Sequence, residues 1–432
     1  AKLALKKLVE ASTKQVMIVG MPLEVTGAIY NCAVVIQNKK ILGIIPKVNL
    51  PDSGEFYEKR FFTSGKKFLD KPIQIDLWGD SVKFGQQIFY NPLTSCYFGV
   101  EICGDLFGQS NPHQFLYQNG ADVVFNISAS TYHLHKKEIR LHLINDTSYR
   151  FKGTYLYVSN GPSDSTSDMT YSGHQIASVC GDTIFNKETL SLDTVINVID
   201  VDIDSIRFVR YSDGYAKGQS HILPEYTPFD IFRDTIYQLE KLPDTDPFVP
   251  KKMEDFEEII DVTTTCLKHR LDYVGVKKVV IGISGGLDST LALLFCYSCF
   301  KKYGLDVKGI IAVTMPGLGT GSKSKNIARN LMNKLGVDAR EVSIKKEAML
   351  QLKALGHGNE EKDVTYENVQ ARLRTMYLMN LANLEKGIVI GTGDLSEIAL
   401  GWSTFNGDQM AMYNLNANLP KTMVKALVQY YI

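Results

Sequence analysis

The stretch VVIGISGGLDST, residues 279–290, joins an apolar run to a glycine turn and the start of a helix. The run at 279–283 predicts a buried strand. Gly285 and Gly286 would let backbone N–H groups approach an anion, and the following helix adds the partial positive charge of its N-terminus. Ser284–Thr290 is therefore predicted to bind phosphate or pyrophosphate.

Few other interpretations fit this turn. The sequence contains no GxxxxGK[ST] motif, and Gly317, Gly319 and Gly321 do not have the GxGxxG spacing of a dinucleotide-binding turn. The remaining alternative is an ordinary glycine turn in which Asp288 or Ser289 caps the helix.

On both sides of this turn, strands and helices alternate. Continuous apolar strands between helices predict a parallel, doubly wound sheet that is covered on both faces. The expected helices are 256–273, 289–303, 323–335 and 367–383, and the expected strands are 278–283, 307–314, 339–343 and 387–391.

A second loop, Gly391–Glu397 (GTGDLSE), also follows an apolar strand. It should share the carboxyl edge of the sheet, where open α/β folds bind ligands. Asp394 and Glu397 have the spacing of a helix capping box. Glu397 could instead hold Mg²⁺ together with Asp288, because Mg²⁺ takes one or two protein oxygens plus phosphate oxygens. The sequence leaves both roles open.

Two further segments suit substrate binding. Asn368 and Arg372 lie one helical turn apart and share a face, although an ordinary solvated face would look the same. The tract 401–421 is polar, aromatic and glycine-containing, which favours a substrate loop over a core element.

The first half of the chain is dominated by short β-branched runs and predicts a large strand core with few helices. The expected strands are 15–20, 30–37, 40–46, 95–102, 122–127, 155–159, 178–184 and 195–201, and the clearest helix is 140–153. Three prolines in LPDTDPFVPKK indicate a linker at 241–252. The predicted domains are therefore 1–240 and 253–432.

In the first half, Cys103 ends a buried strand at a glycine-bearing turn. Most cysteines in apolar runs are inert packing residues. Lys47, in the segment PKVNLP, favours a catalytic role instead, because a lysine beside a thiol lowers its pKa and can stabilise an oxyanion. Asn126–Ser130 ends the next strand at the same sheet edge.

These motifs, in this order, resemble the glutamine-dependent NAD synthetases across nearly the whole chain. PKVNLP, EFYEKR, FGVEICGDLF and NISAS resemble the glutaminase domain of the nitrilase superfamily. SGGLDST, TMPGLGT, DVTYENVQAR, IVIGTGDLSEIALGW, STFNGD and NLPKT resemble the synthetase domain, an N-type ATP pyrophosphatase. The resemblance implies a two-domain α/β protein, with an N-terminal α/β/β/α nitrilase-like sandwich and a C-terminal doubly wound, Rossmann-like sheet.

The implied activity is that of a ligase. ATP would adenylate deamido-NAD, and ammonia from L-glutamine would then displace AMP to form NAD. The implied cofactors are ATP and Mg²⁺, and the implied assembly is a homo-oligomer. The alternatives are another N-type ATP pyrophosphatase, such as another amidotransferase or a tRNA-thiolating enzyme, or a nucleotide-binding relative without chemistry.

The resemblance also assigns residues to each site. In the glutaminase half it implies Cys103 as nucleophile, Lys47 as its electrostatic partner and Glu55 as a second carboxylate. The implied glutamine contacts are Ser130, Lys136 and Ser53. The implied ATP site is Ser284, Gly285, Gly286, Leu287, Asp288, Ser289, Thr290 and Thr392, with Asp288 and Glu397 as Mg²⁺ ligands. The implied deamido-NAD site is Asn368, Arg372, Glu397, Trp402, Ser403, Thr404 and Phe405. Gly104, Ser53 and Lys136 stand where the family usually has glutamate, tyrosine and arginine.

Composition narrows the choice of partners. Lys plus Arg and Asp plus Glu number 47 each, so net charge gives no reason to expect nucleic-acid or anionic-membrane binding. The seven cysteines are scattered, as in reduced cytosolic proteins, and no apolar run approaches the length of a membrane span. A cytoplasmic location is expected.

Both ends of the sequence have helical patterns without caps. Of the glutamates that precede Lys47, neither Glu10 nor Glu24 suits the general base that the resemblance implies. We therefore expect missing residues at both ends, including an N-terminal strand and loop with that glutamate, and no glutaminase activity from residues 1–432 alone.

Overall fold

The computed structural model describes all residues except 164–168, 215–225, 232–237, 240–241, 243 and 359–360. The chain forms two compact units, Ala1–Leu242 and Pro243–Ile432. The expected linker at 241–252 spans this division, and its residues 241 and 243 lie outside the described residues. No helix in the described ranges is long and apolar enough to cross a membrane.

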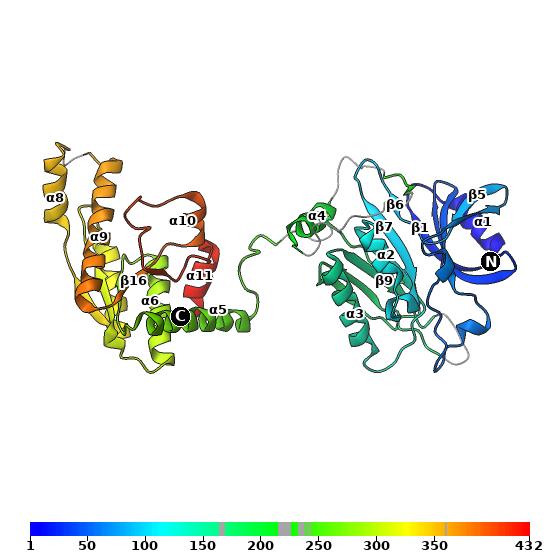
Figure 1. The fold of residues 1–432 in the computed structure, drawn as a ribbon, viewed down its shortest axis with the longest axis horizontal. Helices are drawn as coiled ribbons and strands as arrows, with labels where there is room; N and C mark the ends of the chain where they lie inside the picture. Colours follow the sequence, from blue (N-terminus) through cyan, green and yellow to red (C-terminus); the bar gives the residue numbers. More distant parts are fainter. Residues whose placement is uncertain (164–168, 215–225, 232–237, 240–241, 243, 359–360) are drawn as a thin grey trace. The chain divides into compact units, whose positions relative to one another are not determined.

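Two sheets form the core of the first unit (Figure 1). One sheet has the order β1-β2-β3-β5-β4, with β1 (Met17–Val25), β2 (Ala28–Gln37), β3 (Lys40–Pro46), β4 (Ile73–Leu77) and β5 (Asp80–Phe84). The other has the order β11-β10-β9-β8-β7-β6-β12, with β6 (Phe89–Tyr90), β7 (Tyr97–Ile102), β8 (Val123–Ser128), β9 (Thr154–Ser159), β10 (Gln175–Val179), β11 (Asp182–Lys187) and β12 (Thr227–Pro228). The helices are α1 (Lys2–Ala11), α2 (Pro112–Gln118), α3 (Lys136–Phe151) and α4 (Ile203–Ser212).

Apolar clusters show how these elements are layered. Leu5 of α1 packs with Val34 and other residues on one face of the first sheet. Residues of the opposite face, such as Val35, pack with Val100 of the second sheet. On the far face of the second sheet, α2 and α3 contribute to a third cluster, for example through Ile144. Burial of both faces of each sheet therefore confirms the predicted α/β/β/α sandwich.

The second unit contains one parallel sheet with the order β15-β14-β13-β16-β17. Its strands are β13 (Val279–Gly282), β14 (Ile310–Thr314), β15 (Asp338–Glu341), β16 (Ile388–Gly391) and β17 (Tyr413–Asn414). Its helices are α5 (Met253–Val274), α6 (Leu287–Lys302), α7 (Ser322–Leu335), α8 (Lys345–Ala354), α9 (Val364–Glu385), α10 (Leu395–Leu400) and α11 (Lys421–Tyr430).

Successive residues of β13 belong to different cores, as expected for a sheet covered on both faces. Val279 and Ile281 pack in the cluster that includes α5, α6 and α11. Val280 packs in the cluster that includes Leu381 of α9. Helices α8 and α9 lie side by side (Figure 1). The doubly wound sheet predicted from the sequence is confirmed.

Two of the strand predictions are wrong. Residues 195–201 form no strand, and Ile196 and Val198 are 82% and 64% exposed, so these apolar side chains do not reach a core. The expected strand 178–184 is instead the hairpin of β10 and β11, whose turn contains Cys180 and Gly181 at φ values of 50° and 100°. A β-branched run forms a strand only where it finds a neighbouring strand and a surface to cover.

Alanine at Gly181 should destabilise the first unit more than alanine at Gly27. Both glycines have positive φ, which costs a residue with a Cβ about 1 kcal/mol. A Cβ at Gly181 would also lie 2.9 Å from Cβ of Tyr149, whereas Gly27 has nothing within 4 Å. This overpacking should cost about 1–3 kcal/mol more. Urea unfolding of Gly181→Ala and Gly27→Ala measures the difference, and equal losses of stability would contradict the packing argument.

Candidate functional site

The segment Ser284–Thr290 lies at the carboxyl edge of the parallel sheet, where Ser284–Gly286 form the turn after β13 and Leu287–Thr290 form the first turn of α6. Gly285 has a φ of 85°, and a Cβ there would lie 2.5 Å from the carbonyl oxygen of Ser324. Both the conformation and the close approach therefore require glycine. The Oγ of Ser284 accepts a hydrogen bond from the N–H of Gly286 (3.2 Å) and lies 3.1 Å from the Oγ of Ser289. The loop is thus a compact turn ahead of a helix N-terminus.

The second predicted loop lies beside the first because β13 and β16 pair in parallel, with Val279 opposite Ile388. A buried asparagine bridges the two loops. The Nδ2 of Asn416 donates to the carbonyl oxygens of Asp288 (3.0 Å) and Thr392 (3.1 Å). No sequence motif pointed to Asn416, since its role depends on a contact between distant segments.

Acidic side chains from both loops meet at Lys421. Its Nζ lies 2.8 Å from Oδ1 of Asp288, 2.8 Å from Oδ2 of Asp394 and 3.5 Å from Oε1 of Glu397. These carboxylates raise the pKa of Lys421, although its partial burial acts in the opposite direction. Burial raises the pKa of Glu397, and Lys421 opposes this shift. We call the three carboxylate residues, Asp288, Asp394 and Glu397, the acidic cluster.

Glu397 also takes the capping-box role that the sequence left open. Its N–H donates to Oδ1 of Asp394 (2.8 Å), and the N–H of Asp394 donates to Oε2 of Glu397 (3.3 Å). Glu397 Oε1 still faces Lys421, so the capping role does not remove this oxygen from the site. In the described part of the chain, no three Asp, Glu, His or Cys side chains are arranged to hold a metal ion.

A cavity of about 560 Å³ lies over these loops. The predicted site residues that line it are Ser284, Asp288, Ser289, Thr392, Glu397, Ser403 and Thr404.

Asn368 and Arg372 contact the loop that follows α10. Thr404 Oγ1 donates to Asn368 Oδ1 (2.8 Å), and Arg372 Nε donates to the carbonyl oxygen of Phe405 (3.2 Å). Trp402 and Phe405 are largely exposed. Gly285, Gly286, Leu287 and Thr290 belong to the loop but do not line the cavity. Arg374 and Glu367 of α9 line it and were not predicted.

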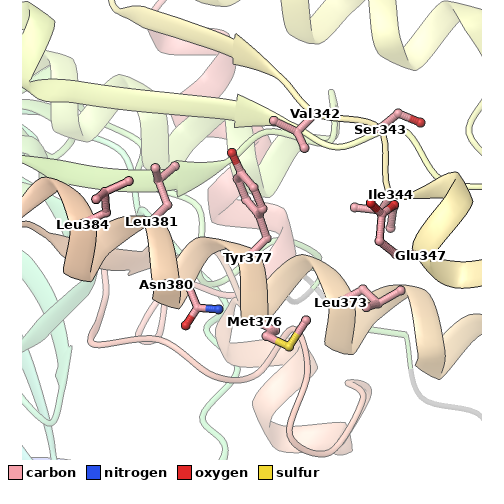
Figure 2. A pocket seen from close by; sticks show the side chains of 10 residues that line it. All are labelled: Val342, Ser343, Ile344, Glu347, Leu373, Met376, Tyr377, Asn380, Leu381 and Leu384. Carbon is pink, nitrogen blue, oxygen red and sulfur yellow. The ribbon is translucent and has the colours of Figure 1, made fainter. Parts of the chain in front are cut away.

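A second hollow, of about 330 Å³, is shown in Figure 2. Side chains from α9, among them Tyr377 and Leu381, and from the segment 342–347 line it. Most of these side chains are apolar, and none of the predicted site residues is among them. The cavity over the two loops is therefore the better candidate for a nucleotide site.

In the first unit, Cys103 directly follows β7 at a strained position, with a φ of 45°. Its N–H donates to Oδ1 of Asn126 (3.0 Å), which is fully buried at the end of β8. Nδ2 of Asn126 donates in turn to the hydroxyl of Tyr155 (2.9 Å). A positive φ in a non-glycine residue persists only where the surroundings impose it. This buried network holds the turn that presents the thiol.

Lys47 lies against the same turn, because a Cβ at Gly104 would be 3.5 Å from Cε of Lys47. Lys47 is buried, and its Nζ pairs with both carboxylate oxygens of Glu58 at 2.6 and 2.8 Å. Glu55, the second carboxylate that the resemblance implies, accepts hydrogen bonds from Oγ1 of Thr131 and Nε2 of His133, both at 2.8 Å. Glu58 is therefore the carboxylate that contacts Lys47, and no sequence motif predicted this ion pair.

The three residues predicted to contact glutamine differ in burial and in their hydrogen-bond partners. Ser130 is buried, and its Oγ accepts a hydrogen bond from Nη1 of Arg140 (3.3 Å). Nζ of Lys136 donates to Oγ1 of Thr131 (2.9 Å), the residue that also binds Glu55. Burial lowers the pKa of Lys136, and the charge of the Glu55 carboxylate opposes this shift. Ser53 is exposed in the segment after Lys47.

Asp105 ties the thiol turn to the segment that carries Lys47. Its Oδ1 accepts from the N–H groups of Val48 (3.1 Å) and Asn49 (2.6 Å), and its Oδ2 accepts from the N–H of Ile102 (3.0 Å). Burial and the nearby Glu101 carboxylate raise the pKa of Asp105 to about 7 despite these donors. The fold therefore favours the neutral acid.

The stability of the first unit should fall as the pH rises from the ordinary pKa of Asp105, 3.8, through about 7. The folded state binds the proton more tightly than the unfolded state, so the stabilisation is complete below the unfolded pKa and is lost above the folded pKa. The loss should be on the order of 3 kcal/mol. Urea unfolding at about pH 5 and about pH 8 should show a smaller difference for Asp105→Asn than for the wild type. Asp52→Asn, at an exposed carboxylate, should retain the full difference, and an unchanged slope in Asp105→Asn would contradict this account.

Comparison with known proteins agrees with this arrangement. Residues 259–431 match the family model described as NAD synthase. A glutamine-dependent NAD(+) synthetase of Mycobacterium tuberculosis is 36% identical over 439 residues, covering 96% of this chain and 64% of the relative. That of Thermotoga maritima is 29% identical, covering 93% of this chain and 65% of the relative.

Solved structures of glutamine-dependent NAD synthetases align over nearly the whole chain, but their structural similarity to it is low. The enzyme of Cytophaga hutchinsonii aligns with 100% of this chain and 71% of its own at 21% identity, with a TM-score of 0.42. The relationship therefore rests on sequence. The chain is similar in sequence to glutamine-dependent NAD(+) synthetases over 96% of its length, and it spans about 64% of the length of the mycobacterial relatives.

Proposed function

We propose that this chain provides the thiol site and the nucleotide site of an enzyme that amidates deamido-NAD to NAD with ATP and with ammonia released from glutamine. The observation that carries the proposal is the meeting of the loop Ser284–Thr290 with the acidic cluster at the carboxyl edge of a parallel sheet. The family match of residues 259–431 supports the same reaction. The lysine-paired thiol turn in the other unit supports glutamine as the source of nitrogen.

In the second unit, the proposed reaction joins two displacements. A carboxylate oxygen of deamido-NAD attacks the α-phosphorus of ATP, and pyrophosphate leaves. Backbone N–H groups of the loop Ser284–Thr290, together with its hydroxyls, would bind the phosphates, and Thr392 would contribute from the second loop. Ammonia then attacks the activated carboxyl carbon, and AMP leaves.

Asp288 and Glu397 are the proposed ligands of Mg²⁺. Hard carboxylate oxygens suit this ion, and both side chains line the cavity. Mg²⁺ would supply positive charge that stabilises the leaving pyrophosphate. Deamido-NAD would be positioned by Asn368 and Arg372, which hold the loop after α10, and by Glu397 and Trp402–Phe405.

In the first unit, the thiol of Cys103 would attack the amide carbon of glutamine and its proton would pass to the leaving nitrogen, so that a thioester forms and ammonia leaves. Water would then hydrolyse the thioester to glutamate and the free thiol. The Lys47 ammonium would stabilise the oxyanion, and Glu58 holds this lysine in place through its ion pair with Nζ. Glu55 would act indirectly, because it binds Thr131, which also binds Lys136. We assign Ser130, Lys136 and Ser53 to glutamine binding.

The assembly that we propose is a homo-oligomer in the cytoplasm. All seven cysteines are free, which supports a reducing compartment. The balanced charge supports small-molecule substrates over polyanionic partners.

Cys103→Ala should lower glutamine-dependent NAD synthesis by at least about a thousandfold and leave ammonium-dependent synthesis within about twofold, because the two reactions use different units. Initial rates with each nitrogen donor, measured in the intact protein, test this. Cys96→Ala, at another partly buried cysteine, should behave as the wild type. Normal use of glutamine by Cys103→Ala would show that the thiol is only a packing residue.

Asp288→Asn and Glu397→Gln should each lower synthesis from both nitrogen donors by at least about a hundredfold, since each removes one carboxylate charge with little change of shape. Thioester formation at Cys103 should persist in both variants. Glu258→Gln, an exposed carboxylate on α5, serves as the matched control. Full ammonium-dependent activity in Glu397→Gln would leave Glu397 with its capping role alone.

A further inference from the structure

Lys421 already provides a positive charge at the point where the acidic side chains converge. Asp394 has no exposed surface, and its Oδ2 has no hydrogen bond and only the ion pair with Lys421. A buried carboxylate oxygen without a compensating partner is strongly unfavourable. Asp288 and Glu397 add negative charge next to it. The acidic cluster therefore requires a cation, and Lys421 supplies it.

Helix stability does not explain a lysine at this position. Lys421 is the first residue of α11, after its N-cap Pro420. Cations near a helix N-terminus interact unfavourably with the helix dipole. The benefit of Lys421 must therefore come from the carboxylates rather than from α11.

The ammonium group is also able to leave. The Lys421 side chain is 45% exposed, whereas that of Asp394 is fully buried. The backbone of Lys421 is anchored separately, because its N–H donates to Oγ of Ser396 (3.1 Å). The flexible stem can therefore swing without moving α11. The cavity of about 560 Å³ that Asp288 and Glu397 line gives another cation access to the same oxygens.

We propose that Lys421 is an exchangeable internal cation, which neutralises Asp288, Asp394 and Glu397 until Mg²⁺ displaces its ammonium group. This inference rests on the proposed function, since it takes Asp288 and Glu397 as metal ligands. It accounts for the arrangement of the carboxylates, which converge on an ammonium group and, among the described residues, form no group of three around a metal position. Mg²⁺ binding and the Lys421 ion pairs would exclude each other.

The test compares Mg²⁺ binding and thermal stability in Lys421→Met, Lys421→Arg and Lys425→Met. Lys425 is an exposed lysine one turn further along α11. Without Mg²⁺, Lys421→Met should unfold several degrees below the wild type, and MgCl₂ should restore the loss. Calorimetric titration with MgCl₂ should show at least about tenfold tighter binding to Lys421→Met, because a competing cation has been removed. Lys421→Arg and Lys425→Met should resemble the wild type.

Two results would overturn the inference. One is equal or weaker Mg²⁺ binding by Lys421→Met, which includes the absence of measurable binding. The other is a loss of thermal stability in Lys421→Met that MgCl₂ does not restore, which would make Lys421 a permanent structural counterion.

Adding Asp288→Asn to Lys421→Met separates this failure from failure of the proposed metal site. If Asp288→Asn abolishes Mg²⁺ binding but Lys421→Met leaves the affinity unchanged, the metal site stands and only the displacement fails. If the double variant binds Mg²⁺ as tightly as Lys421→Met, the ion does not bind at Asp288, and both proposals fail.

Discussion

The parallel pairing of β13 with β16 is the constraint on which the candidate synthetase site depends. The two strands are more than 100 residues apart in sequence, yet Val279 lies opposite Ile388, so the loops that follow them lie side by side. Asn416 then joins the two loops through their backbone carbonyl oxygens. Everything proposed for ATP, for Mg²⁺ and for Lys421 follows from this shared edge.

The position of the Cys103 thiol depends on a different constraint, which is that buried polar groups must form hydrogen bonds. Cys103 occupies a positive-φ position, where Asn126 accepts a hydrogen bond from the N–H of Cys103 and Asp105 accepts one from the N–H of Ile102. Asp105 also accepts hydrogen bonds from the backbone after Lys47, so one side chain positions both the turn with Cys103 and the segment with Lys47. These hydrogen bonds join backbone N–H groups to the side chains of Asn126 and Asp105, so none of them needs a side chain at position 104.

Local patterns predicted much of the fold, since the apolar runs and turn residues are informative on their own. The strand at 40–46 was predicted with the observed bounds, and SGGLDST was placed correctly between a strand and a helix. The strand prediction for residues 195–201 was wrong because a strand needs a neighbouring strand to pair with, and the sequence does not reveal which apolar runs have one. Short elements such as β4, β5, α8 and α10 were missed, since few residues define their pattern.

The site was harder to predict than the fold. Motifs identified the loops and Cys103, but partners across the fold follow no spacing rule: Lys47 binds Glu58 rather than Glu55, and Lys421 binds carboxylates of two distant loops. The central claim is that the second unit activates deamido-NAD with ATP, and exchange of labelled pyrophosphate into ATP tests it most directly. We predict exchange that requires deamido-NAD and Mg²⁺ and needs neither glutamine nor ammonia. Exchange without deamido-NAD, or none with it, would contradict the account.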